Sequence, residues 1–283
     1  MPIVDVLVAS YNGENFLPQQ LDSLVHNGRH VHKVFISDAA SSDGSWRVLL
    51  TWVCENRKSV PEIILSRERT RCSAKSNFTG LLERSVAGYI AFCDQDDVWH
   101  PEKLTLEMAE MQRLEALHPG KPVIVHSDLE VVDATLKTLS TSFFDSQRLP
   151  RVHTDALDQM VQNNVTGCTL LINRAARDLV LPIPPEAIMH DWWIAAKVRY
   201  HDGIIGFVDR PLVKYRQHGA NVIGAKKLDT RHYIKQLVKP WGSVKSLLAV
   251  YRQARAINPG ISAFALLKRK AVLTFRRLRP IRR

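Results

Sequence analysis

Three carboxylates crowd into four positions of the segment "FCDQDDVWHPEKL" (92–104), directly after the apolar run "YIAFC". Asp94, Asp96 and Asp97 repel one another at this spacing, and each resists losing its water, so we expect a cation nearby. In an extended segment residues i and i+2 face the same way, so Asp94 and Asp96 can direct their oxygens at one point while Gln95 faces away. Such a pair suits magnesium or manganese, which completes its shell with water and phosphate oxygens. We therefore predict a divalent cation that holds a nucleotide diphosphate.

A simpler interpretation is that these acids cap the helix expected to begin at Pro101. Asp near a helix start satisfies free N–H groups and interacts well with the helix dipole. We adopt this interpretation for Asp97, but it does not account for all three carboxylates.

The elements that must position these acids alternate between strand and helix patterns. Short β-rich runs at 3–10, 33–38, 62–65 and 89–93 are separated by helical patterns at 16–25, 46–56 and 77–87. This rhythm predicts an α/β fold, with a Rossmann-like, mostly parallel sheet flanked by helices. Ligands of such sheets bind beyond the carboxyl ends of the strands, so Asp38 and the acid cluster are predicted to line one crevice.

Composition is that of a packed soluble protein. The chain has 283 residues, of which 45% are hydrophobic and 24% charged. No run of about 18 apolar residues occurs, and the first residues lack a basic start followed by an apolar core, so we expect a cytoplasmic chain without a membrane span. The four cysteines form no CxxC pair and are interpreted as reduced, mostly buried thiols.

Positive charge is concentrated at the C-terminus. Of 39 Lys and Arg, 16 lie in residues 225–283 beside a single acid, Asp229, which leaves 23 bases and 27 acids in residues 1–224. Apolar residues recur there at helical spacing, namely Phe264, Leu267, Ala271, Phe275 and Leu278, among the basic residues Lys268, Arg269, Lys270, Arg276, Arg277 and Arg279. This pattern is typical of a helix on an anionic membrane surface. The alternative is that the apolar stripe packs on the folded body.

Six segments in order resemble the family 2 glycosyltransferases, especially the rhamnosyltransferase-like branch. They are "VASYNGENFLPQQLDSL", "ISDAASSDGS", "FCDQDDVWHPEKL", "NNVTGCTLLINR", "MHDWW" and "YRQHGANVIG". The resemblance covers about residues 3–224 and implies the GT-A fold over 1–224, with a nucleotide-sugar binding half (1–100) and an acceptor binding half (101–224). Residues 225–283 would be a basic helical extension.

The resemblance also implies roles for individual residues. Asp191 of "HDWW" falls where the family keeps its catalytic base, and Asp38 would accept the pyrimidine N–H. Asp94 and Asp96 would be the DxD pair on the metal, with His218 as a further metal or diphosphate contact. The donor-binding set is Ala9, Ser10, Tyr11, Asp38, Asp94, Gln95 and Asp96, and the acceptor-binding set is Gly167, Cys168, Trp192 and Trp193.

One segment departs from the family pattern. The usual "DDGS" reads "DAAS" here, so Ala39 and Ala40 replace an acid and a glycine. The fold prediction is unaffected, but the identity of the nucleobase and the donor depends on this segment.

A purely structural role is an alternative for several of these residues. Asp191 could be the N-cap of the helix "WWIAAKVRY", Trp192 and Trp193 could be core residues, and His190 could pack or orient its neighbour. A non-catalytic nucleotide-sugar binder, or a nucleic-acid or membrane-binding protein with a basic tail, is a competing function. Nucleic acid is disfavoured because the folded body is net acidic, and nucleotidyl transfer because "ASYNGEN" is not a Gly- and Lys-rich phosphate loop.

The function predicted from these observations is inverting, metal-dependent sugar transfer. No QxxRW segment is present, so the addition of a single sugar is expected. By resemblance the donor is dTDP-L-rhamnose or a similar nucleotide sugar, and the acceptor is a saccharide, lipid-linked in bacterial surface polysaccharide assembly. The protein would then work at the inner face of the cell membrane, attached peripherally by its tail.

Overall fold

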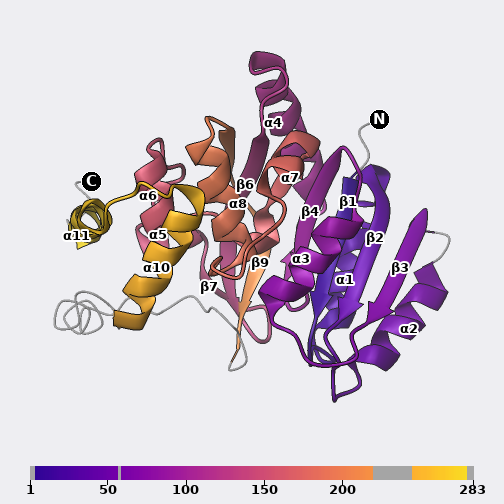
Figure 1. The fold of residues 1–283 in the computed structure, drawn as a ribbon. Helices are drawn as coiled ribbons and strands as arrows, with labels where there is room; N and C mark the ends of the chain where they lie inside the picture. The colour runs from indigo at the N-terminus through magenta and orange to yellow at the C-terminus, as the bar shows by residue number, and fades with distance from the viewer. Residues whose placement is uncertain (1–3, 57–58, 219–243, 279–283) are drawn as a thin grey trace.

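The structure is a computed structural model, and it describes residues 4–56, 59–218 and 244–278. A single curled sheet runs through the described part of the chain in the strand order β3-β2-β1-β4-β8-β6-β9-β5, with β7 paired to β6 (Figure 1). Its strands are β1 (Val4–Ser10), β2 (Val31–Asp38), β3 (Glu62–Arg67), β4 (Tyr89–Asp94), β5 (Val98–Trp99), β6 (Val123–Asp133), β7 (Thr138–Ser140), β8 (Leu171–Asn173) and β9 (Ile204–Gln217).

The N-terminal half of the sheet is parallel, as the alternation of elements predicted. β1 pairs in parallel with β2 and β4, and β2 with β3. The sheet continues into the second half through antiparallel β8, which joins β4 to β6, while β6 and β9 form a long parallel pair. The carboxyl ends of β1 to β4 lie at the lower edge in Figure 1. The sheet is mostly parallel, and its strand ends meet at one edge.

Helices cover both faces of the sheet because strand residues are apolar on both sides. One face carries α1 (Leu17–Val25), α2 (Ser45–Asn56) and α4 (Lys103–Leu117), which pack on alternate β1 residues such as Val6 and Val8. The other face carries α3 (Ala74–Arg84), α6 (Ala156–Val161), α7 (Arg174–Val180) and α8 (His190–Tyr200), which share a core with Leu7. The short elements α5 (Phe143–Gln147), η1 (Gly28–His30) and η2 (Gly167–Thr169) complete this part.

Helix α4 begins at Lys103 and not at Pro101. Lys103 and Glu107 form an ion pair of 2.6 Å between Nζ and Oε2, with both side chains fully buried. The ammonium group also lies 4.2 Å from the ring centroid of Trp99. Removing either partner of this buried pair would destabilise the fold, because the remaining charge would be left without compensation.

Two helices follow the region of the motifs, α10 (Val244–Ile257) and α11 (Ala263–Leu278). Leu266 and Leu273 of α11 are buried in the core shared with α6 and α8, and Arg269 of α11 pairs with Asp158 of α6. The predicted apolar stripe faces outward instead: Phe264 is 74% exposed and Phe275 is 60% exposed. The alternative in which this stripe packs on the folded body is therefore wrong, because a different face of the helix packs.

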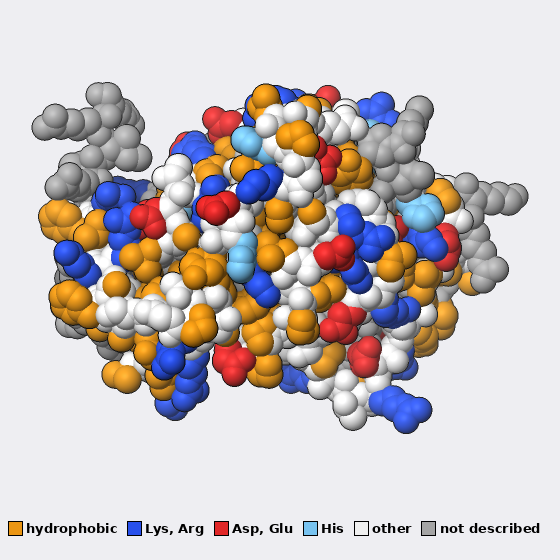
Figure 2. All heavy atoms as spheres, turned by 45° about the horizontal axis from the view of Figure 1, so that its top comes forward, with side chains coloured by type: hydrophobic (Ala, Val, Ile, Leu, Met, Phe, Trp, Pro, Cys, Tyr) orange, Lys and Arg blue, Asp and Glu red, His pale blue; other side chains and the backbone are white. Residues whose placement is uncertain are grey.

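The basic residues of α11 are also distributed differently from the prediction. Lys268 and Arg276 are exposed, whereas Lys270 and Arg277 line a cavity and Arg269 is paired. At the left edge of Figure 2, where α11 lies, hydrophobic and basic side chains gather on the surface. The side chain of Leu278, residue Arg279 and residues 225–243 of the predicted extension lie outside the described part.

Two further expectations concern membrane spans and cysteines. Among the described helices, none is both long and apolar enough to cross a membrane. All four cysteines are free thiols, with Cys93 and Cys168 buried, Cys72 half-buried and Cys54 exposed. The prediction of mostly buried thiols therefore holds for two of the four.

Candidate active site

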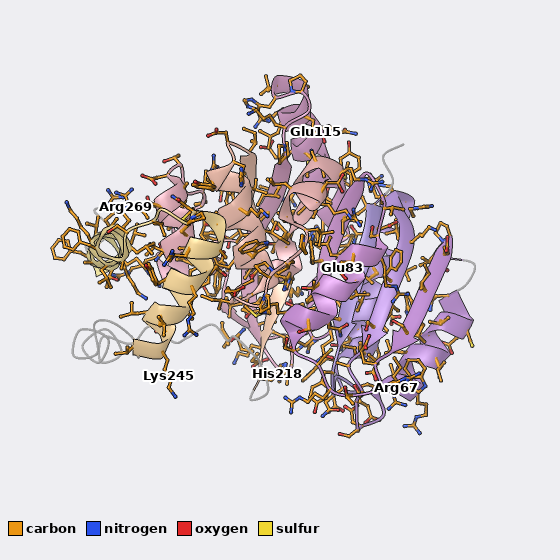
Figure 3. The ribbon with its side chains drawn as sticks, viewed as in Figure 1. Arg67, Glu83, Glu115, His218, Lys245 and Arg269 are labelled. Atoms are coloured by element: carbon orange, nitrogen blue, oxygen red, sulfur yellow. The ribbon has the colours of Figure 1, made fainter. Side chains whose placement is uncertain are left out.

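A cavity of about 1610 Å³ opens at the carboxyl ends of the strands. One wall consists of the ends of β1 and β4 with their following loops, and the other consists of residues 161–167, the start of α8 and the inner face of α11. In Figure 3, His218 after β9 and Arg67 at the end of β3 both lie at this edge, whereas Glu115 of α4 lies at the opposite end. The cavity is thus where a parallel sheet is expected to bind its ligand.

Asp94 and Asp96 both line this cavity. Among the described residues, the Asp94 carboxylate has no hydrogen-bond or ion-pair partner, and burial together with the charges of Asp96 and Asp191 raises its pKa to about 8. The Asp96 carboxylate lies 2.8 Å from Nε2 of His218, whose ring is tilted against that of Phe16 with the centroids 4.4 Å apart. The two acids of the predicted pair therefore both reach the cavity, and Asp94 has no compensating charge among the described residues.

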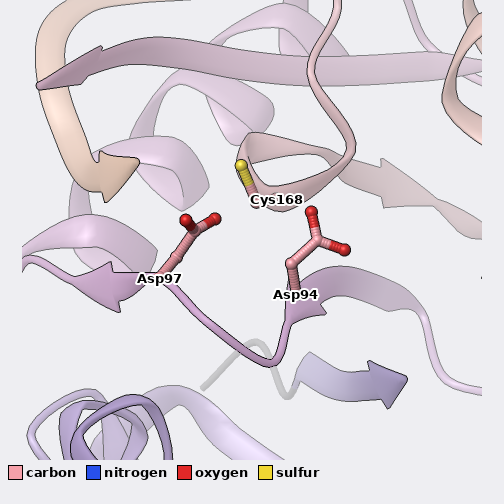
Figure 4. Close-up of side chains that lie close together, drawn as sticks. All are labelled: Asp94, Asp97 and Cys168. Atoms are coloured by element: carbon pink, nitrogen blue, oxygen red, sulfur yellow. The ribbon is translucent and has the colours of Figure 1, made fainter. Parts of the chain in front are cut away.

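Asp97 does not cap α4, contrary to the prediction. Its side chain is fully buried, and its Oδ1 accepts the backbone N–H of Arg216 at 3.0 Å. Figure 4 shows the Asp94 and Asp97 carboxyl groups and the Cys168 sulfur facing one another, and these groups lie within 4.8 Å. Burial and the neighbouring carboxyl groups raise the pKa of the Cys168 thiol and of Asp97. A neutral thiol beside a neutral carboxyl group forms an internal polar contact and a poor site for a hard cation.

Arg216 anchors the loop Asp94–Asp97 through its guanidinium group. Its Nε donates to the Asp96 carbonyl at 2.7 Å, Nη1 to the Ala134 carbonyl and Nη2 to Oε1 of Gln19, both at 2.6 Å. The side chain is almost completely buried, and its guanidinium group lies over the ring of Phe16. Because one guanidinium group bonds three segments, the position of the Asp94–Asp97 loop depends on the end of β9.

At the end of β1, the predicted donor contacts Ala9, Ser10 and Tyr11 all line the cavity. Gln95 does not simply face away, because its amide accepts the Tyr11 N–H at 2.7 Å and donates to the Tyr11 carbonyl at 2.9 Å. A Cβ on Gly13 would lie 2.4 Å from Oε1 of Gln95, so only glycine allows this approach. Gln95 therefore couples the first motif to the acid loop.

Asp38 lies beneath the wall and not on it. Its carboxylate accepts from the backbone and hydroxyl of Ser41 and lies 3.3 Å from Nε of Arg67, so its oxygens are already engaged. In this structure Asp38 fixes the turn that follows β2. Ala40 in that turn has a φ of 58°, a left-handed conformation that costs alanine energy and suits the glycine of the family pattern.

Asp191 lies across the cavity on α8. The helix begins at His190 with Met189 as N-cap, so Asp191 is a first-turn residue and the N-cap interpretation is wrong. Burial raises the pKa of its carboxyl group to about 6, although Asn163 Nδ2 donates to Oδ2 at 3.2 Å and the Trp192 N–H donates to Oδ1 at 2.7 Å. A carboxylate with this pKa is suited to accept a proton near neutral pH.

The four predicted acceptor contacts separate into two pairs. Gly167 and Trp192 line the cavity, whereas Cys168 and Trp193 are not on its wall. Trp193 is 2% exposed and donates its indole N–H to the Val180 carbonyl, so it is a core residue. Cys168 contacts the acid loop from behind.

His190 packs, as one interpretation proposed. Its ring lies 4.3 Å from that of Phe78 and 5.2 Å from that of Phe92, and burial lowers its pKa to about 3. A Cβ on Gly167 would lie 3.0 Å from Nε2 of His190. The neutral ring therefore fills the space between the η2 turn and α3 and supports the start of α8.

Sequence reasoning missed several wall residues. Arg71 lines the cavity with its guanidinium group 4.5 Å from the ring centroid of Tyr11, and Asn163 bonds Asp191. Lys270 and Arg277 come from α11. The charged segment "SRERTRCSAKSN" (66–77) could supply a basic contact to a diphosphate, but charged loops are usually solvated, so its sequence did not single out Arg71. Nothing in the sequence placed α11 beside Asp191.

Comparisons with known proteins show which family this chain resembles. The family model described as "Glycosyl transferase family 2" matches residues 5–178. Among curated relatives, the dTDP-rhamnosyl transferase RfbG of Shigella flexneri is 27% identical over 240 residues, which cover 77% of this chain and 74% of that protein. An uncharacterized glycosyltransferase of Nostoc is 24% identical, over 77% of this chain and 66% of its own length. One of Rickettsia prowazekii is matched over half of its length.

Solved structures share the fold at low sequence identity. S. aureus TarS in complex with UDP-GlcNAc has a TM-score of 0.62 at 14% identity, covering 98% of this chain and 72% of that chain. The mannosyltransferase PcManGT of Pyrobaculum calidifontis, in complex with GDP-Man and Mn²⁺, has a TM-score of 0.58 at 16% identity, covering 96% and 80%. These likenesses show the GT-A fold.

Proposed function

Because this chain belongs to glycosyl transferase family 2 and is a glycosyltransferase of the GT-A fold, we propose that it transfers one sugar with inversion from a nucleoside-diphosphate sugar to a saccharide hydroxyl. One observation carries the proposal. The Asp94 carboxylate, which has no partner among the described residues, and the buried Asp191 carboxylate face the same cavity from opposite walls. Inverting displacement needs this separation, with a base on the acceptor side and the departing diphosphate on the other.

On the acceptor side, Asp191 takes the proton of the attacking hydroxyl. Asn163 holds one of its oxygens and the Trp192 N–H holds the other, which fixes the orientation of the carboxylate. The ring of Trp192 is fixed in turn by a bond of 2.8 Å from its indole nitrogen to the Gln159 carbonyl. A saccharide placed against Trp192 presents its hydroxyl to a base that is already oriented.

On the donor side, Asp94 and Asp96 are the residues that would hold magnesium or manganese. The fit is good, because Asp94 offers an unpaired hard oxygen ligand to the cavity and Asp96 lies two residues on. A bound divalent ion would stabilise the negative charge that develops on the departing diphosphate. Arg71, over the Tyr11 ring, supplies a further positive charge to the same wall.

The likeness to a dTDP-rhamnosyl transferase supports dTDP-L-rhamnose as the donor. A second relative, the putative teichuronic acid biosynthesis glycosyltransferase TuaG of Bacillus subtilis, is 26% identical over 110 residues and supports a role in bacterial surface polysaccharide synthesis. The acceptor in this proposal is a lipid-linked saccharide.

Calorimetric titration tests the donor side. Nucleoside diphosphates and nucleotide sugars, dTDP-L-rhamnose among them, are titrated with and without manganese into the wild type, Asp96→Ala and Asp22→Ala. Asp22 is an exposed acid of α1 and serves as the charge-matched control. We expect manganese-dependent binding that Asp96→Ala loses and Asp22→Ala keeps. Equal binding by all three proteins would contradict the assignment of the site.

We further propose that the outer face of α11 attaches the protein to anionic lipid at the inner face of the cell membrane. Phe264 and Phe275 are exposed there beside exposed Lys268 and Arg276. Exposed apolar side chains next to basic ones match the chemistry of an anionic membrane surface.

Sedimentation with vesicles tests this attachment. The double variant Phe264→Ser/Phe275→Ser should lose sedimentation with phosphatidylglycerol vesicles, while Leu248→Ser on α10, which also removes an exposed apolar side chain, should keep it. Equal sedimentation of the wild type and the double variant would reject the role of α11.

A further inference from the structure

The inner face of α11 contributes a part of the cavity wall that lies outside the family match at 5–178. Lys270, Leu273, Thr274 and Arg277 of this helix line the same cavity as Asp191 and Trp192. Two of these four side chains are cations. They lie on the acceptor wall, apart from the strand ends that carry Asp94 and Asp96.

Lys270 is one of the two cations that α11 contributes to this wall. Its side chain is half-buried, and burial lowers its pKa. Within residues 4–56, 59–218 and 244–278, it has no hydrogen bond or ion pair. Partial burial of an unpaired ammonium group is unfavourable, and an anion in the cavity would compensate for it.

A second cavity of about 410 Å³, here called the side chamber, lies between α11 and residues 144–158. It shares Leu149, Gln162, Leu273 and Arg277 with the active-site cavity, so the two spaces adjoin along α11. An acceptor bound at Asp191 can therefore extend past Lys270 into the side chamber.

The side chamber carries an excess of positive charge. Arg148, Arg151, Arg276 and Arg277 line it, against the two acids Asp145 and Asp158. His153 also lines it, but burial lowers the pKa of its ring, so it is not counted as a charge. Both acids are already paired, Asp145 with Arg151 at 2.8 Å and Asp158 with Arg269 at 2.8 Å. Arginine side chains that outnumber the acids in a confined space are suited to bind phosphate oxygens.

We propose that Lys270 and the side chamber bind a phosphate or pyrophosphate group carried by the acceptor, an inference that rests on the proposed glycosyl transfer at Asp191. The enzyme would thus use cations on both walls, Arg71 for the donor diphosphate and Lys270 with the side chamber for the acceptor. The oxyanion could belong to a lipid carrier or to a water-soluble phosphosaccharide, since both present the same phosphate chemistry.

The test is calorimetric titration of inorganic pyrophosphate into the full chain in EDTA. Without divalent ions, pyrophosphate cannot be held through a metal at Asp94 and Asp96. We expect Lys270→Ala to weaken binding about tenfold to a hundredfold, since a hydrogen bond to a charged group is lost. Lys270→Arg should restore most of the affinity. Lys245→Ala, which removes an exposed charge from α10, should have no effect.

Three results would overturn the inference: no binding of pyrophosphate, equal weakening by Lys245→Ala, or loss of binding in Arg71→Ala with full binding in Lys270→Ala. A parallel titration of donor nucleotide with manganese into Lys270→Ala checks the fold and the donor site. If donor nucleotide does not bind, the result counts against the proposed function. If donor nucleotide binds and only the pyrophosphate results differ from those expected, the result counts against the inference alone. Tighter binding of geranyl pyrophosphate than of pyrophosphate would support a lipid carrier, and equal binding would support a water-soluble phosphosaccharide.

Discussion

The proposed donor wall of the cavity, here called the donor wall, is made from strand ends. The proposed acceptor wall, here called the acceptor wall, is made from helix starts, a short turn and α11. Ala9 and Asp94 are adjacent partners of the parallel β1–β4 ladder, so their relative position is fixed by backbone hydrogen bonds. Asp191 and Lys270 belong to α8 and α11 and are placed by side-chain packing. The family match, which ends at residue 178, includes the strand ends and not these helices.

This difference suggests a division of labour. Strands held by backbone hydrogen bonds form a rigid wall, which fits a part of the ligand that does not vary, such as a diphosphate. Helices held by side-chain packing can shift and so accommodate different acceptors. Substitutions on the donor wall should therefore change donor binding alone, and those on the acceptor wall should change turnover or acceptor binding alone. The following predictions test that separation, from the largest effect to the smallest.

Asp191→Asn should lower kcat by about 10²–10⁴-fold, because an amide cannot accept the proton of the acceptor hydroxyl. Donor affinity should stay within twofold of the wild type by calorimetry. Glu186→Gln, at an exposed acid just before α8, is the control and should be fully active. A large loss of donor affinity in Asp191→Asn would show that the two walls are not separate.

The pH dependence of kcat should report the same carboxylate. The pKa of Asp191 is raised to about 6, and only its deprotonated form acts as a base, so activity is present above this pH and lost below it. At saturating donor and manganese, kcat should fall about tenfold per pH unit on the acidic side. A profile that stays flat to pH 5 would exclude Asp191 as the base.

Arg71→Ala should weaken donor binding about tenfold, since one charge-assisted contact to the diphosphate is lost. The KM for the acceptor should not change, because Arg71 lies over Tyr11 on the donor wall. Arg69→Ala removes an exposed charge from the same loop and is the matched control. An unchanged donor affinity in Arg71→Ala would mean that this guanidinium group does not reach the diphosphate.

Ala40→Gly should raise the free energy of unfolding by about 0.5–1 kcal/mol, because glycine adopts the left-handed φ of 58° without strain. Ala39→Gly at the buried neighbour should lower it, since Ala39 does not have a positive φ. Urea denaturation of both variants measures the difference. A loss of stability in Ala40→Gly would contradict the strain inferred for this turn.

The sequence predicted the donor wall far better than the acceptor wall. The strands ending at Ser10, Asp38 and Asp94 were predicted from short β-rich runs, and parallel pairing brings such ends together wherever they lie in the chain. Asp97 was misinterpreted because its partner, the backbone N–H of Arg216, is more than a hundred residues away. Spacing in the sequence carries no information about such a contact.

The helical extension shows the same limit. A helix with a stripe at Phe264, Leu267, Ala271 and Phe275 was correctly predicted from its periodicity. Periodicity does not tell which side of a helix finds a partner, and the contact of Leu266 and Leu273 with the core depends on where α6 lies. Lys270 was therefore assigned to the surface, although it faces the cavity.

The order of synthesis gives α11 a further consequence. A ribosome makes residues 263–278 after every residue of the donor wall, and domains generally fold as they emerge. The nascent chain can thus assemble the proposed donor wall while the proposed acceptor wall still lacks α11. A growing chain would bind nucleotide before it could position an acceptor, so the timing of translation itself would keep an unfinished enzyme from transferring sugar.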